Sequence, residues 1–249
     1  MNHDLNDLLR DWPHEPGQIK ARKIIGLDGR EKVQLRIDLG VIQMELSGRP
    51  DGRKPHGCES LLLHHQVRAR EMKGDDSRFL LTPEECSELQ QEGIQYYHRY
   101  ISLFQINDFK GVIRDTQRNL DMFAFVAEHV EREDIIASFQ QFKPYVLMMN
   151  TRAKAAIELE RDDFSAAERQ IQRGLGKIRD YFTTHHNSDL MAQSPEISFL
   201  EEWLAEILSK RPLSKLEVMQ REMENAIARE AYERAAELRD AINQYREQD

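Results

Sequence analysis

The residues with the clearest potential for chemistry are histidines and cysteines near position 60. His64 and His65 are adjacent, and His56 and Cys58 precede them by a few residues. Side chains of adjacent helical residues point about 100° apart, so these two histidines cannot bind one metal ion as an i, i+4 pair does. Cys58 and Cys86 have no CxxC partner, which argues against a zinc ribbon and favours reduced thiols over a disulfide. We therefore predict surface histidines on a helix and no metal site.

No residue pattern for catalysis is found along the chain. A Gly-rich phosphate loop, a nucleophile elbow and a Ser/His/Asp order are all missing, and the glycines at 26–29 indicate a turn because no helix follows them. Asp162 and Asp163 lie at a turn where helix caps are expected. His185 and His186 follow a predicted helix end, where positive charge is favourable. The sequence thus predicts a protein that is not an enzyme and has no cofactor.

Composition excludes a membrane protein. With 32% charged and 40% hydrophobic residues and a net charge of −9, the chain is more polar than an average globular protein, which has about 45–50% apolar residues. No apolar run reaches the roughly 18–20 residues that span a bilayer. Asp4 and Asp7 stand where a signal peptide needs an apolar core, so we expect a cytoplasmic protein.

The modest apolar content favours several modules over one large core in 249 residues. The expected fold class is mainly α: a helical-hairpin array with a small N-terminal β-hairpin and helix, and a C-terminal antiparallel helical hairpin. The predicted parts are an N-terminal amphipathic segment (1–17), a small basic α+β element (18–73), the helical-hairpin domain (74–209), a linker (210–213) and the C-terminal hairpin (214–249).

Alternation of apolar and polar residues predicts the strands. The turn signal at Asp28 and Gly29 joins a strand at 23–27 to a strand at 33–39, which continues to Met44 with a bulge or bend at Gly40. A helix at 59–73 would cover the exposed face of this hairpin, which alone is marginally stable. Inward-facing side chains are expected at Val33, Leu35, Ile37 and Leu39 of the strand and at Leu62, Leu63 and Val67 of the helix.

From residue 74 onward the pattern is helical. Thr82 to Glu85 form a capping box with Pro83 at the first helical position, where the missing N–H costs no hydrogen bond. The predicted helices are 83–105, 109–130, 133–160, 164–182 and 195–209.

A repeat with an offset of 55 residues runs through this region. Each copy consists of a helix, a turn with Asp-Phe, and a second helix, with Phe109 and Phe164 at matching positions. The second copy is similar to a tetratricopeptide-type helix pair, although 55 departs from that family's period of about 34. This resemblance implies an array in which each unit buries a face against its neighbour. The alternative is two amphipathic hairpins that are alike by chance.

The last segment shows two narrow apolar seams of coiled-coil type. The helices meet near Arg229 and Glu230, which predicts an antiparallel pair, and Glu230 and Glu233 are expected in the first turn of the second helix. Two helices of about 15 residues cannot bury enough apolar surface alone, so the hairpin must dock onto the rest of the chain, a second copy or a partner's hairpin. The seams consist of Leu216, Met219, Met223 and Ala226, and of Ala231, Ala235, Leu238, Ile242 and Tyr245.

The residues from Ala231 to Asp240, read as AYERAAELRD, resemble the UVR motif. This motif occurs in the UvrB and UvrC subunits of the bacterial excision nuclease, in an arginine-kinase activator and in some Clp ATPases. The resemblance implies a bacterial helical hairpin that pairs with another UVR hairpin or with a partner protein. Ala231 departs from the pattern, because the family often has Asp or Asn there. The implied partner-binding residues are Leu216, Met223, Tyr232, Ala235, Leu238 and Ile242, with Glu233, Arg239 and Asp240 as a polar border.

Positive charge is concentrated near the N-terminus. Residues 18–73 contain 12 Lys+Arg and 7 Asp+Glu, a net charge of +5, which leaves −14 for the remainder. This surface is interpreted as a solvated face, as a contact for nucleic acid or an acidic partner, or as a surface that holds the chain's own acidic helices. Nucleic acid is not favoured, because no aromatic residues for base stacking are interleaved. The candidate contacts are Lys20, Arg22, Lys23, Lys32 and Arg36.

The residues together favour a non-enzymatic adaptor that docks a protein partner, another UVR protein or a second copy through its C-terminal hairpin. Two alternatives stay open. One is an accessory factor of DNA repair that contacts nucleic acid through residues 18–73. The other is an activator of a kinase or a Clp-type protease.

Overall fold

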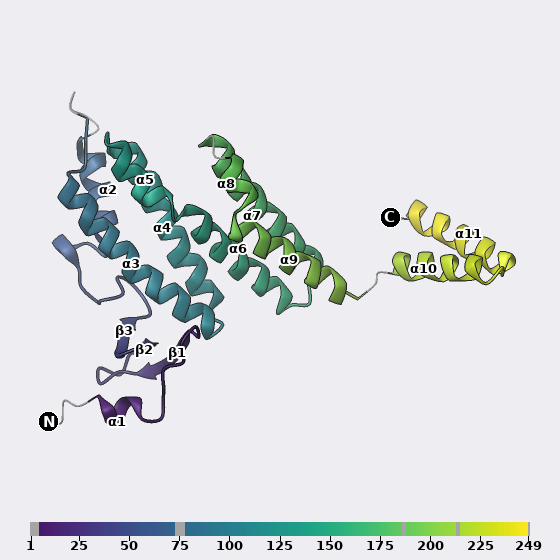
Figure 1. Cartoon of the computed structure of the whole chain (residues 1–249), viewed down its shortest axis with the longest axis horizontal. Helices are drawn as coiled ribbons and strands as arrows, with labels where there is room; N and C mark the ends of the chain where they lie inside the picture. Colours follow the sequence, from purple (N-terminus) through teal and green to yellow (C-terminus); the bar gives the residue numbers. More distant parts are fainter. Residues whose placement is uncertain (1–4, 73–77, 186–187, 213–214, 249) are drawn as a thin grey trace. The chain divides into compact units, whose positions relative to one another are not determined.

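The computed structural model describes residues 5–72, 78–185, 188–212 and 215–248, and it is mainly α-helical with one three-stranded antiparallel sheet (Figure 1). The chain divides into two compact units, one ending at Leu204 and the other beginning at Ala205. The expected fold class is therefore confirmed. Within the described residues, no helix combines the length and apolar character needed to cross a membrane.

The sheet contains one strand more than predicted. Strands β1 (Lys20–Ile25), β2 (Glu31–Ile37) and β3 (Gly40–Glu45) pair in this order. The turn after β1 forms as predicted, with Gly29 at φ 73° and its N–H donating to the carbonyl of Gly26 at 2.9 Å. The expected bulge at Gly40 is wrong: Ile37 pairs with Gly40, so the chain reverses there and begins β3.

Both faces of β2 are buried. Val33, Leu35 and Met44 form the apolar face, and helix α3 contacts β1 and β2. The inward positions predicted for Ile37 and Leu39 are wrong, because the strand ends there and these side chains are 40% and 88% exposed.

The polar face of β2 is covered by the N-terminal segment, which includes the short helix α1 (Asn6–Leu9). The Arg36 Nε donates to the Trp12 carbonyl at 2.8 Å, and the Arg22 guanidinium lies 4.0 Å from the centre of the Trp12 ring. Lys32, Gln34 and Arg36 are all buried, although alternation predicts a polar, solvated face. Gln34 bonds side chains of both neighbouring strands, and Lys32 pairs with Glu45 of β3.

Helix α2 (Leu61–Glu71), preceded by the 3-10 turn Pro55–Gly57, does not cover the sheet as predicted. It contacts α3 (Pro83–Gln105), toward the end of α3 that lies away from the sheet (Figure 1). Leu61, Leu62 and Ala69 are buried in a cluster with residues of α3 and α4, whereas Leu63 is 36% exposed. Lys73, the predicted end of this helix, lies outside the described residues.

The helical region follows the predicted order with two exceptions, one of which is the short helix α8 (Ser188–Ala192), which was not predicted. The single helix predicted at 133–160 is two helices, α5 (Glu133–Gln140) and α6 (Lys143–Leu159), because Pro144 lacks the N–H that continuation would require. Packed pairs are α3 with α4, α4 with α6, and α6 with α7. The other helices are α4 (Phe109–His129), α7 (Phe164–Thr184) and α9 (Pro195–Lys210).

The two copies of the repeat share the same turn. Asn107 and Asp162 both have φ 58°, in the left-handed region that closes a helix. The next residues, Asp108 and Asp163, cap the following helices and accept N–H bonds at 3.1 and 2.8 Å. Close packing of α6 and α7 depends on Gly174, where an added Cβ would lie 2.1 Å from Thr151 Oγ1. The 55-residue offset thus reflects a repeated local conformation.

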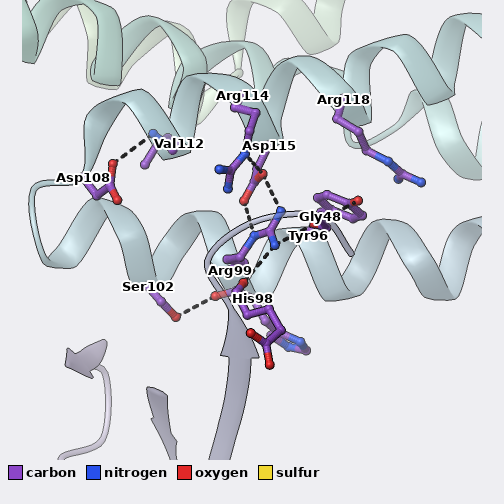
Figure 2. Close-up of polar contacts among 12 residues, drawn as sticks. Gly48, Tyr96, His98, Arg99, Ser102, Asp108, Val112, Arg114, Asp115 and Arg118 are labelled. Atoms are coloured by element: carbon purple, nitrogen blue, oxygen red, sulfur yellow. Dashed lines mark hydrogen bonds and ion pairs between the residues drawn. The ribbon is translucent and has the colours of Figure 1, made fainter. Parts of the chain in front are cut away.

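A buried ion-pair network attaches β3 and the following loop to α3 and α4 (Figure 2). Arg99 contacts Asp115 through two bonds of 2.6 and 2.8 Å, and both side chains are at most 1% exposed. The same guanidinium donates to the carbonyls of Glu45 and Gly48, each at 2.9 Å. Arg114 also donates to Asp115, at 2.8 Å.

A second buried carboxylate, Glu92, connects α3 to α2. It accepts the N–H groups of Leu61 and Leu62, at 2.7 and 3.3 Å, and it pairs with Arg118 of α4. The Arg118 guanidinium lies over the ring of Tyr96, 4.3 Å from its centre. This network was not predictable from the sequence, because Arg99 is 16 positions from Asp115 and 54 positions from Glu45 along the chain.

Candidate partner-binding site

Two of the five candidate nucleic-acid contacts are buried in the basic α+β element at 18–73. Lys32 pairs with Glu45, and with Asp28 at 3.0 Å, and these carboxylates raise the pKa of the lysine. Arg36 donates to the Trp12 carbonyl and to carbonyl groups of the turn between β2 and β3. Both residues are at most 9% exposed, so neither offers a free charge at the surface.

The other three basic candidates also have partners within the chain. Lys20 Nζ lies 2.5 Å from Glu15 Oε1, and Lys23 Nζ lies 3.6 Å from Asp108 Oδ2 at the α3–α4 turn. Arg22 donates to a glutamine of the neighbouring strand at 2.9 Å. Three of the five candidates thus pair with carboxylates, and one of these carboxylates, Asp108, belongs to the helical region.

The histidines near position 60 lie differently from the prediction. His65 is only 2% exposed, so its assignment to the surface is wrong, and burial lowers its pKa to about 4. Its Nδ1 lies 3.1 Å from an Arg68 nitrogen. His64 stacks on His56 with ring centres 4.1 Å apart. Within the described residues, no group of three His, Cys, Asp or Glu side chains is arranged to hold a metal ion.

The remaining candidates for chemistry have local structural roles. Cys58 and Cys86 are free thiols, and burial raises the pKa of Cys86. His185 Nδ1 lies 2.7 Å from the Tyr181 carbonyl one helical turn earlier, while His186 lies outside the described residues. Asp163 caps α7 as expected.

The C-terminal hairpin consists of α10 (Lys215–Ala228) and α11 (Tyr232–Gln248), which pack against each other. Its turn repeats the conformation of the two upstream turns: Glu230 has φ 59°, and the Ala231 N–H donates to the Ala226 carbonyl at 2.9 Å. Glu230 therefore precedes α11, not within its first turn as predicted, whereas Glu233 lies in that turn. Ser214 and Asp249, the ends of the predicted segment, lie outside the described residues.

One consequence of this turn concerns Ala231. It occupies the position that Asp108 and Asp163 have in the upstream turns, directly before the first helical residue. The Ala231 carbonyl accepts the first helical bond from Ala235 at 3.1 Å, but its methyl side chain cannot accept an N–H bond. Ala231, where the UVR motif often has Asp or Asn, thus leaves α11 without a side-chain cap.

The predicted seam is only partly closed within the hairpin. Ala226, Ala235, Leu238 and Ile242 are buried. Tyr232, expected on the same face, is 67% exposed at the first helical position of α11. The seam residues toward the open end are half-buried; these are Leu216, Met219, Met223 and Tyr245.

The predicted polar border is exposed. Glu233 lies in the first turn of α11, and Arg239 pairs with Asp240 at 2.9 Å. Arg234 Nη2 lies 4.0 Å from Glu222 Oε2 and so links the two helices across the hairpin. Ile227, which the sequence did not single out, is 50% exposed near the turn. The hairpin therefore presents half-open apolar surface beside exposed charged groups, an arrangement suited to binding another helix pair.

Comparison with curated proteins and with solved structures finds no significant match to the chain. The likeness of the middle region to tetratricopeptide helix pairs therefore stays a prediction. Residues 214–248 match a family model described as UvrB/uvrC motif, so the C-terminal hairpin of this chain carries a UVR motif.

Proposed function

We propose that this protein is a non-enzymatic, cytoplasmic adaptor whose UVR hairpin docks a protein partner or a second copy of the chain. The observation that carries the proposal is the incomplete closure of the hairpin seam. Leu216, Met219 and Met223 of α10 are only half-buried, although α10 and α11 pack along each other. Two short helices with so few buried side chains gain little stability alone. A second helix pair would complete a four-helix arrangement.

The test must distinguish docking from folding of the hairpin. Leu238 is 6% exposed within the seam, so Leu238→Asp would unfold the hairpin and lose binding in either case. Tyr232→Ser and Ile227→Ser alter side chains that are 67% and 50% exposed, so the hairpin should fold normally. Arg221→Ala, an exposed polar position on α10, is the matched control.

Self-association is measured by analytical ultracentrifugation of the full chain, and partner binding by co-purification from the native host with mass spectrometry. We expect Tyr232→Ser or Ile227→Ser to weaken association at least tenfold while the circular dichroism spectrum is unchanged. Arg221→Ala should behave like the parent protein. Unchanged mass and an unchanged partner set for both serine variants would contradict the proposal.

The nucleic-acid alternative predicts a different result. Binding to duplex or single-stranded DNA, measured by fluorescence anisotropy, should weaken steeply between about 50 and 200 mM salt if phosphate contacts dominate. Because the five basic candidates already have partners within the chain, we expect no such binding at low salt. An activator of a kinase or Clp-type protease would likewise bind protein without nucleic acid, and the partner's identity distinguishes it from a general adaptor.

A further inference from the structure

The first unit contains a cavity of about 510 Å³ enclosed by α3, α4, α5 and α6. This volume lies in the range of roughly 300–1,000 Å³ that is typical of small-molecule sites. Its wall is unusually aromatic for a chain with 8% aromatic residues. The aromatic lining residues are Tyr97, Tyr100, Phe123, Phe139, Phe142 and Tyr145.

The cavity wall carries no formal charge. None of the described residues that line it is Asp, Glu, Lys or Arg, although 32% of the chain is charged. His98 is the only histidine in the lining, and burial lowers its pKa, which keeps it neutral at pH 7. A charged ligand would lose hydration here without gaining a counter-charge, so the wall selects an uncharged ligand.

Tyr100 is the most deeply buried tyrosine of the lining. It is 1% exposed, and no hydrogen bond joins its hydroxyl to a described residue. Burial raises its pKa, so the hydroxyl stays protonated and can donate. Asn119, in contrast, is already engaged: its amide donates to the Gly93 carbonyl and its oxygen accepts from Arg118, both at 3.1 Å. The hydroxyl can therefore donate to an oxygen atom of a ligand in the cavity.

The cavity also has an entrance and a fixed floor. Ile94 and Phe142 are each 50% exposed at its rim, which leaves a path for a small molecule. At the floor, Gly93 allows the Met122 side chain to approach, because an added Cβ would lie 2.7 Å from Met122 Cε.

We propose that this cavity binds a small, uncharged aromatic compound that carries a hydrogen-bond acceptor, with the rings of the wall stacking on it and the Tyr100 hydroxyl donating to it. The site lies in the helical array and is independent of docking by the UVR hairpin. Aromatic contacts supply most of the binding, and the Tyr100 hydroxyl orients the ligand.

The probe is 2-naphthol, a neutral fused-ring alcohol, and its charged counterpart is 2-naphthoate. Binding to the full-length protein is followed by probe fluorescence and by saturation-transfer NMR at pH 7. We expect saturable binding of 2-naphthol with one site, and binding of 2-naphthoate at least tenfold weaker because no cation lines the wall.

Two variants locate the site. Tyr100→Phe removes only the hydroxyl and should weaken 2-naphthol binding about three- to tenfold, the effect of one hydrogen bond. Ser138→Phe introduces a ring into the lining and should abolish binding. Its matched control is Ser209→Phe, since both serine hydroxyls donate to the carbonyl three residues earlier at 2.7 Å, but Ser209 is exposed on α9.

Circular dichroism and thermal unfolding verify that each variant is folded. The proposal is overturned if 2-naphthol shows no saturable binding to the folded parent protein, or if 2-naphthoate binds equally well. It is also overturned if folded Ser138→Phe binds 2-naphthol as the parent does, because the probe would then occupy another surface.

Discussion

Replacing Asp115 by asparagine should destabilise the first unit more than any surface substitution. The change keeps the size of the side chain but removes the charge that neutralises Arg99. Two contacts of 2.6 and 2.8 Å join these side chains, and neither is more than 1% exposed. Arg99 would keep its two carbonyl partners and at most one neutral amide oxygen, so a buried cation would lose its counter-charge.

The expected loss follows from this burial. Removing one member of a buried ion pair typically costs about 3–5 kcal/mol, because the other charge stays desolvated and unpaired. An exposed pair contributes about 1 kcal/mol or less. Arg179 and Glu201 form such a pair, at 2.5 Å with side chains about half exposed, and Glu201→Ala is therefore the matched control.

Urea denaturation, followed by tryptophan fluorescence and circular dichroism, gives the free energy of unfolding in water. We expect a decrease of about 3–5 kcal/mol for Asp115→Asn and at most about 1 kcal/mol for Glu201→Ala. In a double-mutant cycle, Arg99→Met combined with Asp115→Asn should cost clearly less than the sum of the two single changes. A loss below about 1 kcal/mol for Asp115→Asn, or strict additivity in the cycle, would refute the reasoning.

Three further predictions concern a histidine, two glycines and a helix cap. His65 has its pKa lowered from 6.5 to about 4, so the unfolded state binds its proton first and stability falls as pH decreases through this window. The free energy of unfolding is lowered by about 3 kcal/mol at pH 4, and this effect vanishes above pH 6.5. The variant His65→Leu should lack this part of the acid destabilisation, which is measured by urea titrations at several pH values. Gly174→Ala should destabilise by about 1–3 kcal/mol because of the contact with Thr151, whereas Gly176→Ala, with no atom within 4 Å, should stabilise by about 1 kcal/mol in thermal unfolding. Ala231→Asp should raise the stability of the C-terminal hairpin by about 1 kcal/mol, measured by circular dichroism, because it supplies the missing cap.

Each of these three predictions can be contradicted by its own measurement. Equal pH dependence of the parent protein and His65→Leu would show that folding does not lower the pKa of His65. Equal effects at Gly174 and Gly176 would show that α6 and α7 separate freely. No gain from Ala231→Asp would show that the turn differs from those at Asp108 and Asp163.

Local features were predictable from the sequence because they depend on neighbouring residues. The capping box at Thr82, the Asp-Phe turns and the hairpin turn near Glu230 all arise from contacts within a few positions. The UVR motif was recognisable for the same reason, since its signature covers ten consecutive residues. Periodicity likewise located most helices, but it missed the short helix α8 and the break before Pro144 that separates α5 from α6.

The partners of individual side chains depended on the tertiary structure. Alternation correctly predicted that Val33 and Leu35 face inward. It could not show that Trp12 contacts Arg36 on the opposite face, or that Lys32 is buried there beside Glu45. Position on a helix likewise could not show that His65 faces a core cluster.

The sequence by itself determined the helical elements, their turns and the apolar seam of the C-terminal hairpin, because hydrophobic period and capping act over one or two helical turns. Only the tertiary structure decided which charges are free and which are neutralised. Arg99 and Asp115 are ordinary charged residues in the sequence, and they become a buried pair only when α3 and α4 pack together. The aromatic cavity arises in the same way, since its wall combines residues from four helices whose side chains meet only in the folded chain.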